Sequence, residues 1–104
     1  MIQGAYGPEG LAAIVKNPQY RIQAVKPTIE KLDGKLKDAY FFFGEYDFVI
    51  IAEMPDNMSA VAISLAFGAG GALKSTKTTP LLSATETMEA MKKASTTGYK
   101  PPTT

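Results

Sequence analysis

The chain has 104 residues, of which 45% are hydrophobic and 20% charged, and its formal net charge is +1. This composition is typical of one globular domain, and the nearly neutral charge argues against a nucleic-acid-binding surface. Because the sequence contains neither cysteine nor histidine, it excludes disulfides, thiolate nucleophiles and the commonest metal, haem and near-neutral base chemistry, and we expect no metal and no cofactor.

The N-terminal segment, residues 1–6, is short, apolar and compatible with a first β-strand that ends at Gly7-Pro8. It lacks the basic start and long apolar run of a secretory leader. No run in the chain approaches the roughly 18 apolar residues of a membrane span. We therefore expect a cytoplasmic protein that contacts neither membrane nor nucleic acid.

Apolar residues at helical spacing follow in two segments, separated by a break at Asn17-Pro18. Pro8 suits the first turn of the first helix. The second helix is predicted to end at Asp33-Gly34, with glycine in the usual C-terminal capping position.

The most informative segment is a predicted β-hairpin over residues 35–53. An aromatic run at residues 40–43 and an apolar run at residues 48–52 flank a turn that contains glycine. Because side chains of a strand alternate between the two faces of a sheet, the aromatic run places large rings on both faces. Each face therefore needs a cover.

After the hairpin, apolar spacing predicts a helix that begins near Asp56 or Asn57, either of which can cap its free amides. The threonine-rich segment 72–82 predicts a strand, and Pro80 near its end favours an edge position, where a missing amide is tolerated. A capping-box pattern at residues 83–86 then opens a last helix.

The predicted order is strand, helix, strand, strand, helix, strand, with an added C-terminal helix. This is the βαββαβ pattern of an α+β ferredoxin-like domain with an antiparallel sheet. We place the domain at residues 1–95 and a flexible tail rich in proline and threonine at residues 96–104.

In this fold the crossover helices cover one face of the sheet and leave the other open. Either Tyr40 and Phe42 or Phe41 and Phe43 would then project from the open face. Burying one such ring is worth about 1.5 to 3 kcal/mol, which favours a homodimer or higher oligomer through this face. The alternative is that the C-terminal helix covers the open face and keeps the chain monomeric.

Several polar side chains of the hairpin and the second helix are candidate functional residues, and each of them also has a possible structural role. Tyr46 and Asp47 in the turn can act as hydrogen-bond donor and carboxylate base, or can simply cover and brace the turn. Glu53 is a pocket acid or a strand-end charge. Arg21, the single arginine, binds an anion or forms a surface ion pair.

Several of these segments together resemble the GYD domain family. They are Gly-Glu-Tyr-Asp at residues 44–47, Met-Pro-Asp-Asn at residues 54–57, the alanine-rich helix that follows, and Lys-Thr-Thr-Pro-Leu-Leu at residues 77–82. The resemblance covers roughly residues 3–95. It implies a dimeric α/β-barrel, in which ferredoxin-like subunits pair through their open sheet faces, and special interest in Gly44, Tyr46, Asp47 and Arg21. It implies no defined biochemical role.

We predict a cytoplasmic homo-oligomeric domain that binds a small molecule or serves a structural role, with a pocket between the sheet and the helices. The candidate ligand-binding residues are aromatic or basic: Tyr6, Arg21, Tyr40, Phe42 and Tyr46. The alternative is an enzyme, a metal-free monooxygenase or isomerase with Asp47 or Glu53 as base and Tyr46 as donor.

Overall fold

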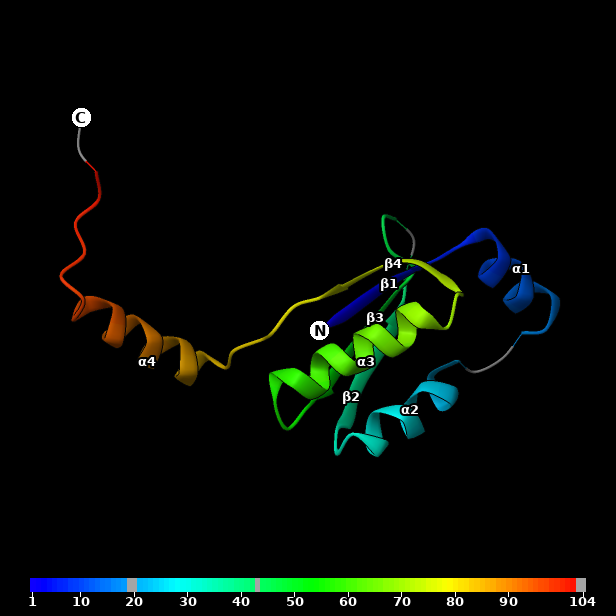
Figure 1. Cartoon of the computed structure of the whole chain (residues 1–104), viewed down its shortest axis with the longest axis horizontal. Coiled ribbons are helices and arrows are strands. Elements are labelled where there is room, and N and C mark those ends of the chain that lie inside the picture. The colour runs from blue at the N-terminus through cyan, green and yellow to red at the C-terminus, as the bar shows by residue number, and fades with distance from the viewer. Residues whose placement is uncertain (19–20, 43, 103–104) are drawn as a thin grey trace.

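The computed structural model describes residues 1–18, 21–42 and 44–102, without the side chains of Arg21 and Ile22. Phe43, one of the predicted open-face residues, lies outside the described residues. Over the described part, the chain forms one sheet and four helices (Figure 1). In chain order the elements are β1 (Ile2–Tyr6), α1 (Pro8–Lys16), α2 (Arg21–Lys31), β2 (Lys35–Phe41), β3 (Phe48–Glu53), α3 (Asn57–Ala69), β4 (Leu73–Thr78) and α4 (Ala84–Ser95).

The sheet has four strands in the order β2-β3-β1-β4, and every neighbouring pair is antiparallel. The order of elements and this topology confirm the mixed α+β prediction and are consistent with the ferredoxin-like pattern. β4 is an edge strand that ends at Thr78, before Pro80, so the missing amide of the proline lies outside the ladder.

One face of the sheet is covered by α2 and α3. The register places Ile2 opposite Ile50, and it places Gly4 and Phe41 on either side of Phe48. These side chains share a face with the core, in which Ile2, Phe48 and Ile50 meet Ile29 of α2 and Ile63 of α3. Phe41 therefore belongs to the helix-covered face.

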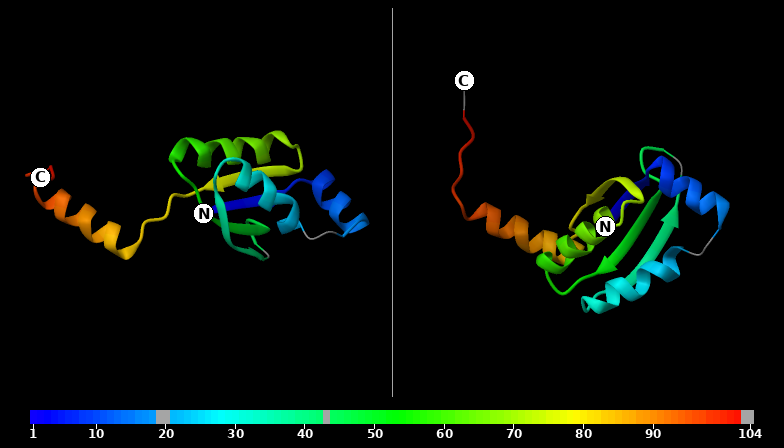
Figure 2. Two further views of the ribbon diagram at one scale, coloured as in Figure 1. Left: turned by 90° about the horizontal axis from the view of Figure 1, so that it is seen from below. Right: turned by 45° about the vertical axis from the view of Figure 1, so that its right-hand side comes forward.

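The opposite face of the sheet is open. Tyr40 pairs with Val49 and Asp38 with Ile51, which places these side chains on the side away from the core. Tyr40 is 58% exposed. None of the four described helices covers this face, because α2 and α3 lie on the other side and α1 and α4 lie beyond the sheet (Figures 1 and 2).

The end of α2 corrects one expectation about glycine. The amide of Asp33 donates to Glu30 O and that of Gly34 to Ile29 O, each at 3.0 Å, which is the Schellman pattern. The left-handed residue of this motif is Asp33, with φ of 60°, and not Gly34. Gly34 is needed for space, since a Cβ there would overlap Ile29 and the sulfur of Met54.

The N-terminal caps of α3 and α4 follow the sequence. Asp56 precedes α3, and its Oδ1 accepts a hydrogen bond of 2.7 Å from the amide of Ser59. Ser83 and Glu86 form the predicted capping box at the start of α4. Side-chain caps of this kind depend only on near neighbours in the chain, which is why the sequence predicts them well.

The C-terminal helix α4 stands away from the rest of the domain (Figures 1 and 2). No residue of α4 is buried. The radius of gyration is 17.6 Å, whereas a compact chain of this length has about 13 Å. The structure therefore does not show the alternative in which α4 covers the open face. Among the described helices, none is long and apolar enough to cross a bilayer.

Candidate functional site

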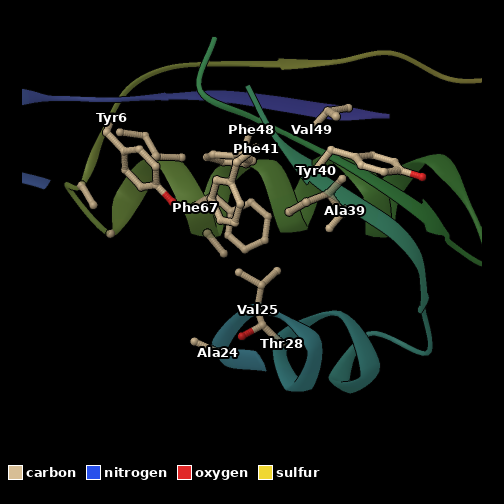
Figure 3. A pocket seen from close by; sticks show the side chains of 15 residues that line it. Tyr6, Ala24, Val25, Thr28, Ala39, Tyr40, Phe41, Phe48, Val49 and Phe67 are labelled. Atoms are coloured by element: carbon tan, nitrogen blue, oxygen red, sulfur yellow. The ribbon is translucent and has the colours of Figure 1, made fainter. Parts of the chain in front are cut away.

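A cavity of about 280 Å³ lies between the sheet and helices α2 and α3. Figure 3 shows the rings of Tyr6, Phe41, Phe48 and Phe67 gathered on the sheet side of Val25, which projects from α2. The side chains that α2 presents to the cavity are small or branched, whereas the sheet and α3 contribute large aromatic rings. It is the candidate binding site of this domain.

The central ring of the cavity is positioned by a glycine on the neighbouring strand. Gly4 is the cross-strand partner of Phe48, and a Cβ on Gly4 would overlap the Phe48 ring. Phe48 in turn packs against Tyr6, with ring centroids 5.5 Å apart and planes tilted by 50°. A side chain at position 4 would therefore displace the Phe48 ring.

The described lining of the cavity carries no charged side chain. Its polar side chains are those of Tyr6, Thr28 and Tyr40, and the register directs Tyr40 to the other face of the sheet. Phe41 lines the cavity and is 57% exposed, so the cavity is open to solvent on the side of this ring. A charged ligand would lose its hydration here without gaining a counter-charge.

The predicted ligand-binding residues do not converge on one place. Tyr6 and Tyr40 belong to the lining of the cavity, whereas Phe42 and Tyr46 do not. The side chain of Arg21, at the start of α2, lies outside the described residues.

Tyr40 projects from the open face beside Asp38, two residues before it on β2. A hydrogen bond to Asp38 and the charge of that carboxylate raise the pKa of Tyr40 above its ordinary value. The predicted ligand-binding residue Tyr40 is therefore part of the cavity lining, but its ring projects mainly from the open face of the sheet.

Asp47 braces the tip of the hairpin against β1. Its Oδ2 accepts a hydrogen bond of 2.8 Å from the amide of Tyr6, and its own amide donates to Gly4 O at 2.8 Å. The amide of Phe42 donates to Asp47 O at 3.0 Å and closes the turn. The carboxylate thus has a structural partner, which is β1 and not the backbone of its own turn.

Glu53 lies at the other end of β3 from Asp47. Its carboxylate forms an ion pair of 3.3 Å with Lys37, and its side chain is 69% exposed. The six residues of β3 separate Glu53 from Asp47 by roughly 20 Å. The structure therefore does not bring together the two candidate bases, and Glu53 has the surroundings of a strand-end charge.

The sequence reasoning missed the contribution of the helices to the cavity. Val25 and Thr28 of α2 and Phe67 of α3 line it, and the first two are three residues apart on one helical face. That spacing was a readable signal for a core face. It could not show that the space between this face and the sheet is incompletely filled.

Fold and cavity together define an α+β domain with one helix-covered sheet face, one open face and an apolar pocket between layers. Residues 1–91 match the family model of the GYD domain, and the chain belongs to this family. The match confirms the resemblance carried by the hairpin turn and the segments that follow it. No curated protein and no solved structure matches the chain significantly.

Proposed function

We propose that this GYD domain is a cytoplasmic homo-oligomeric binding protein for a small, uncharged and largely apolar molecule. The observation that carries the proposal is the cavity of about 280 Å³, whose described lining has aromatic and aliphatic side chains and no charge. Binding sites for small molecules are typically concave and apolar, with few polar groups that orient the ligand. Tyr6 and Thr28 are the polar side chains in a position to do so.

The size of the cavity limits the ligand to one or two rings. An engineered apolar cavity of roughly 150 Å³ binds benzene, and the present cavity has about twice that volume. The exposed ring of Phe41 adds a stacking surface where the cavity opens. An uncharged bicyclic aromatic molecule therefore matches both the volume and the lining.

The open face of the sheet supports the homo-oligomeric part of the proposal. Tyr40 and Val49 are paired on this face, Ile51 follows on β3, and Phe42 continues the alternation of β2. More than half of Tyr40 is exposed, and a ring of this size carries about 150 to 250 Å² of surface. Pairing of two open faces, as in a dimeric α/β-barrel, would remove this apolar strip from water.

The ligand class is tested with two probes of the same shape, 2-naphthol and 2-naphthoate, at neutral pH. We expect 2-naphthol to raise the melting temperature in a concentration-dependent manner, by an amount equivalent to about 2.7 kcal/mol at 100 times its Kd. We expect 2-naphthoate to raise it much less, because the described lining offers its carboxylate no positively charged partner. Equal stabilisation by both compounds would contradict the proposed site.

Two Ala→Phe variants, one in the cavity lining and one outside it, test where 2-naphthol binds. Ala24 lies on α2, lines the cavity and is exposed, so Ala24→Phe should fill part of the cavity without disturbing the core. Ala13 on α1 is also exposed and does not line the cavity. We expect at least a tenfold weaker affinity for 2-naphthol in Ala24→Phe and no change in Ala13→Phe.

A metal-free monooxygenase or isomerase remains the alternative function. Tyr46, Asp47 and Glu53 would carry it, and none of the three lines the cavity. We therefore propose binding and leave turnover to a direct assay, in which Asp47→Asn and Tyr46→Phe are the decisive variants.

A further inference from the structure

Helix α3 exposes an apolar surface on the side that faces away from the sheet. The sequence of α3, Asn57–Ala69, contains no charged residue. Met58, Val61 and Leu65 are 82%, 54% and 68% exposed, and their spacing places them on one side of the helix. Helices that are apolar all round are normally buried. We call these three residues the outer stripe; within the single chain they have no cover.

The C-terminal arm, residues 79–95, is a second apolar element without a partner. α4 has twelve residues, and helices of this length are marginally stable in water unless they pack against something. Glu86, Glu89 and Lys93 lie on the side away from its methionines, whereas Lys92, four residues after Met88, borders the apolar side. The large apolar side chains of the arm are 55 to 61% exposed: Leu81, Leu82, Met88 and Met91.

We propose that the C-terminal arm of one copy packs on the outer stripe of a second copy, and that the exchange is reciprocal. One contact then covers both apolar elements. The outer stripe supplies the packing that α4 lacks, and the arm supplies the cover that α3 lacks. Because the same two surfaces meet twice around a two-fold axis, the assembly is closed.

The area involved is that of a stable interface. Outer stripe and arm carry seven side chains per chain that are each more than half exposed. Full burial of an aliphatic side chain removes roughly 60 to 120 Å² from water, so the reciprocal contact buries roughly 500 to 1,000 Å² of apolar surface. With the polar share of a typical interface the total is roughly 900 to 1,700 Å², which overlaps the range of about 1,200 to 2,000 Å² for specific complexes.

The arm is better matched to the outer stripe than to the open face of the sheet. The open face carries Tyr40, Val49 and Ile51 on β2 and β3, but on β1 and β4 it presents Gln3 and Lys77, which are paired across the strands. Asp38 adds a charge on β2. The outer stripe has no charged neighbour on its own helix. The arm contact therefore leaves the open face free for the sheet-to-sheet contact proposed above.

In the structure the arm does not lie on the outer stripe of its own chain (Figure 1). α3 packs on β4, where the hydroxyls of Ser64 and Thr78 are hydrogen-bonded, so α3 separates β4 from the outer stripe. α4 on that stripe would lie beyond the full width of α3, about 10 to 12 Å, and a further helix radius. The six Cα–Cα steps from Thr78 to Ala84 span roughly 20 to 22 Å when fully extended, so folding back would use nearly the whole connection and would require it to turn away from the direction of β4. In the structure it continues away from the sheet (Figure 1).

The absence of cysteine from the sequence allows a direct test by crosslinking. Leu65→Cys is prepared with ¹⁵N label and Met88→Cys without label, and the two proteins are mixed and oxidised. We expect a mixed disulfide dimer of twice 11.1 kDa, identified by mass spectrometry. The matched control is Glu89→Cys, next to Met88 in the helix but on its charged side, and it should react with Leu65→Cys at least tenfold more slowly.

Four outcomes would overturn the proposal. Equal rates for Met88→Cys and Glu89→Cys would show random collision. Preferential coupling of Leu65→Cys to itself would show that two α3 helices meet. Rapid closure within a chain that carries both cysteines would show that the arm folds back on its own α3. Faster capture of Met88→Cys by Val49→Cys than by Leu65→Cys would place the arm on the open face.

A sedimentation experiment separates this contact from the proposed function. The double variant Met88→Glu/Met91→Glu should abolish association through the arm, while binding of 2-naphthol is unchanged. These side chains are exposed and distant from the cavity, so the domain should keep its fold. If the mass in solution is unchanged, the arm contact is contradicted and the ligand proposal is not affected. If the double variant loses only the binding of 2-naphthol, the ligand proposal is contradicted and the arm contact is not.

Discussion

Asp47→Ala should destabilise the domain because it removes the brace between the hairpin tip and β1. The carboxylate accepts a hydrogen bond of 2.8 Å from the partly buried amide of Tyr6. Hydrogen bonds to a charged group contribute about 1.5 to 3 kcal/mol, and an amide left without a partner costs a similar amount. We therefore expect a loss of about 2 kcal/mol in the free energy of unfolding, or roughly 8 to 16 °C in melting temperature.

The assay is urea unfolding followed by circular dichroism, since the chain contains no tryptophan. Asp47→Asn keeps an acceptor oxygen in place, so it should lose about half as much as alanine, because a neutral hydrogen bond is weaker than a charged one. The matched control is Glu45→Ala, an exposed residue of the same turn, for which we expect a change within about 0.5 kcal/mol.

The brace also acts on the cavity. Tyr6 carries the amide that Asp47 binds, and its ring packs against Phe48 in the lining. Asp47→Ala should therefore weaken binding of 2-naphthol as well as stability. Equal losses of stability in Asp47→Ala and Glu45→Ala would refute the brace, and an intact fold with no turnover in Asp47→Asn would favour the catalytic role instead.

Three further predictions follow from the geometry. Gly4→Ala should lower the free energy of unfolding by about 1 to 3 kcal/mol and weaken 2-naphthol binding, because its Cβ would displace Phe48. Gly68→Ala is the control, since a Cβ there meets nothing, and it should be neutral or stabilising. Equal effects of the two variants in urea unfolding would contradict this prediction. Tyr40→Glu should weaken association through the open face, seen as a lower mass in sedimentation equilibrium at micromolar concentration; an unchanged mass would count against that interface. For Asp56, the hydrogen bond from Ser59 lowers the pKa, so its stabilising effect is complete above the unfolded-state pKa, near pH 4, and is lost as the pH falls through the folded-state pKa. The difference in melting temperature between wild type and Asp56→Asn should thus shrink from about pH 5 to about pH 3, and a constant difference would exclude this linkage.

The amino-acid sequence by itself determined the order of the elements, the hairpin, the caps of α3 and α4, and the family. Each of these depends on residues close together in the chain: glycine in a turn of the hairpin, Asp56 before a helix, Ser83 and Glu86 three residues apart. Propensity and capping act over a few residues, so their signals are present in the linear pattern.

Only the tertiary structure decided which face each aromatic residue occupies and what surrounds it. A shift of one residue in register exchanges the two faces of a strand, and pairing of Phe41 with Phe48 is what assigns Phe41 to the helices and Tyr40 to the open side. The bond from Tyr6 to Asp47 likewise joins residues 41 positions apart in the chain. Contacts at such separations depend on how the strands pair and how the layers pack, and the periodicity of one segment does not predict them.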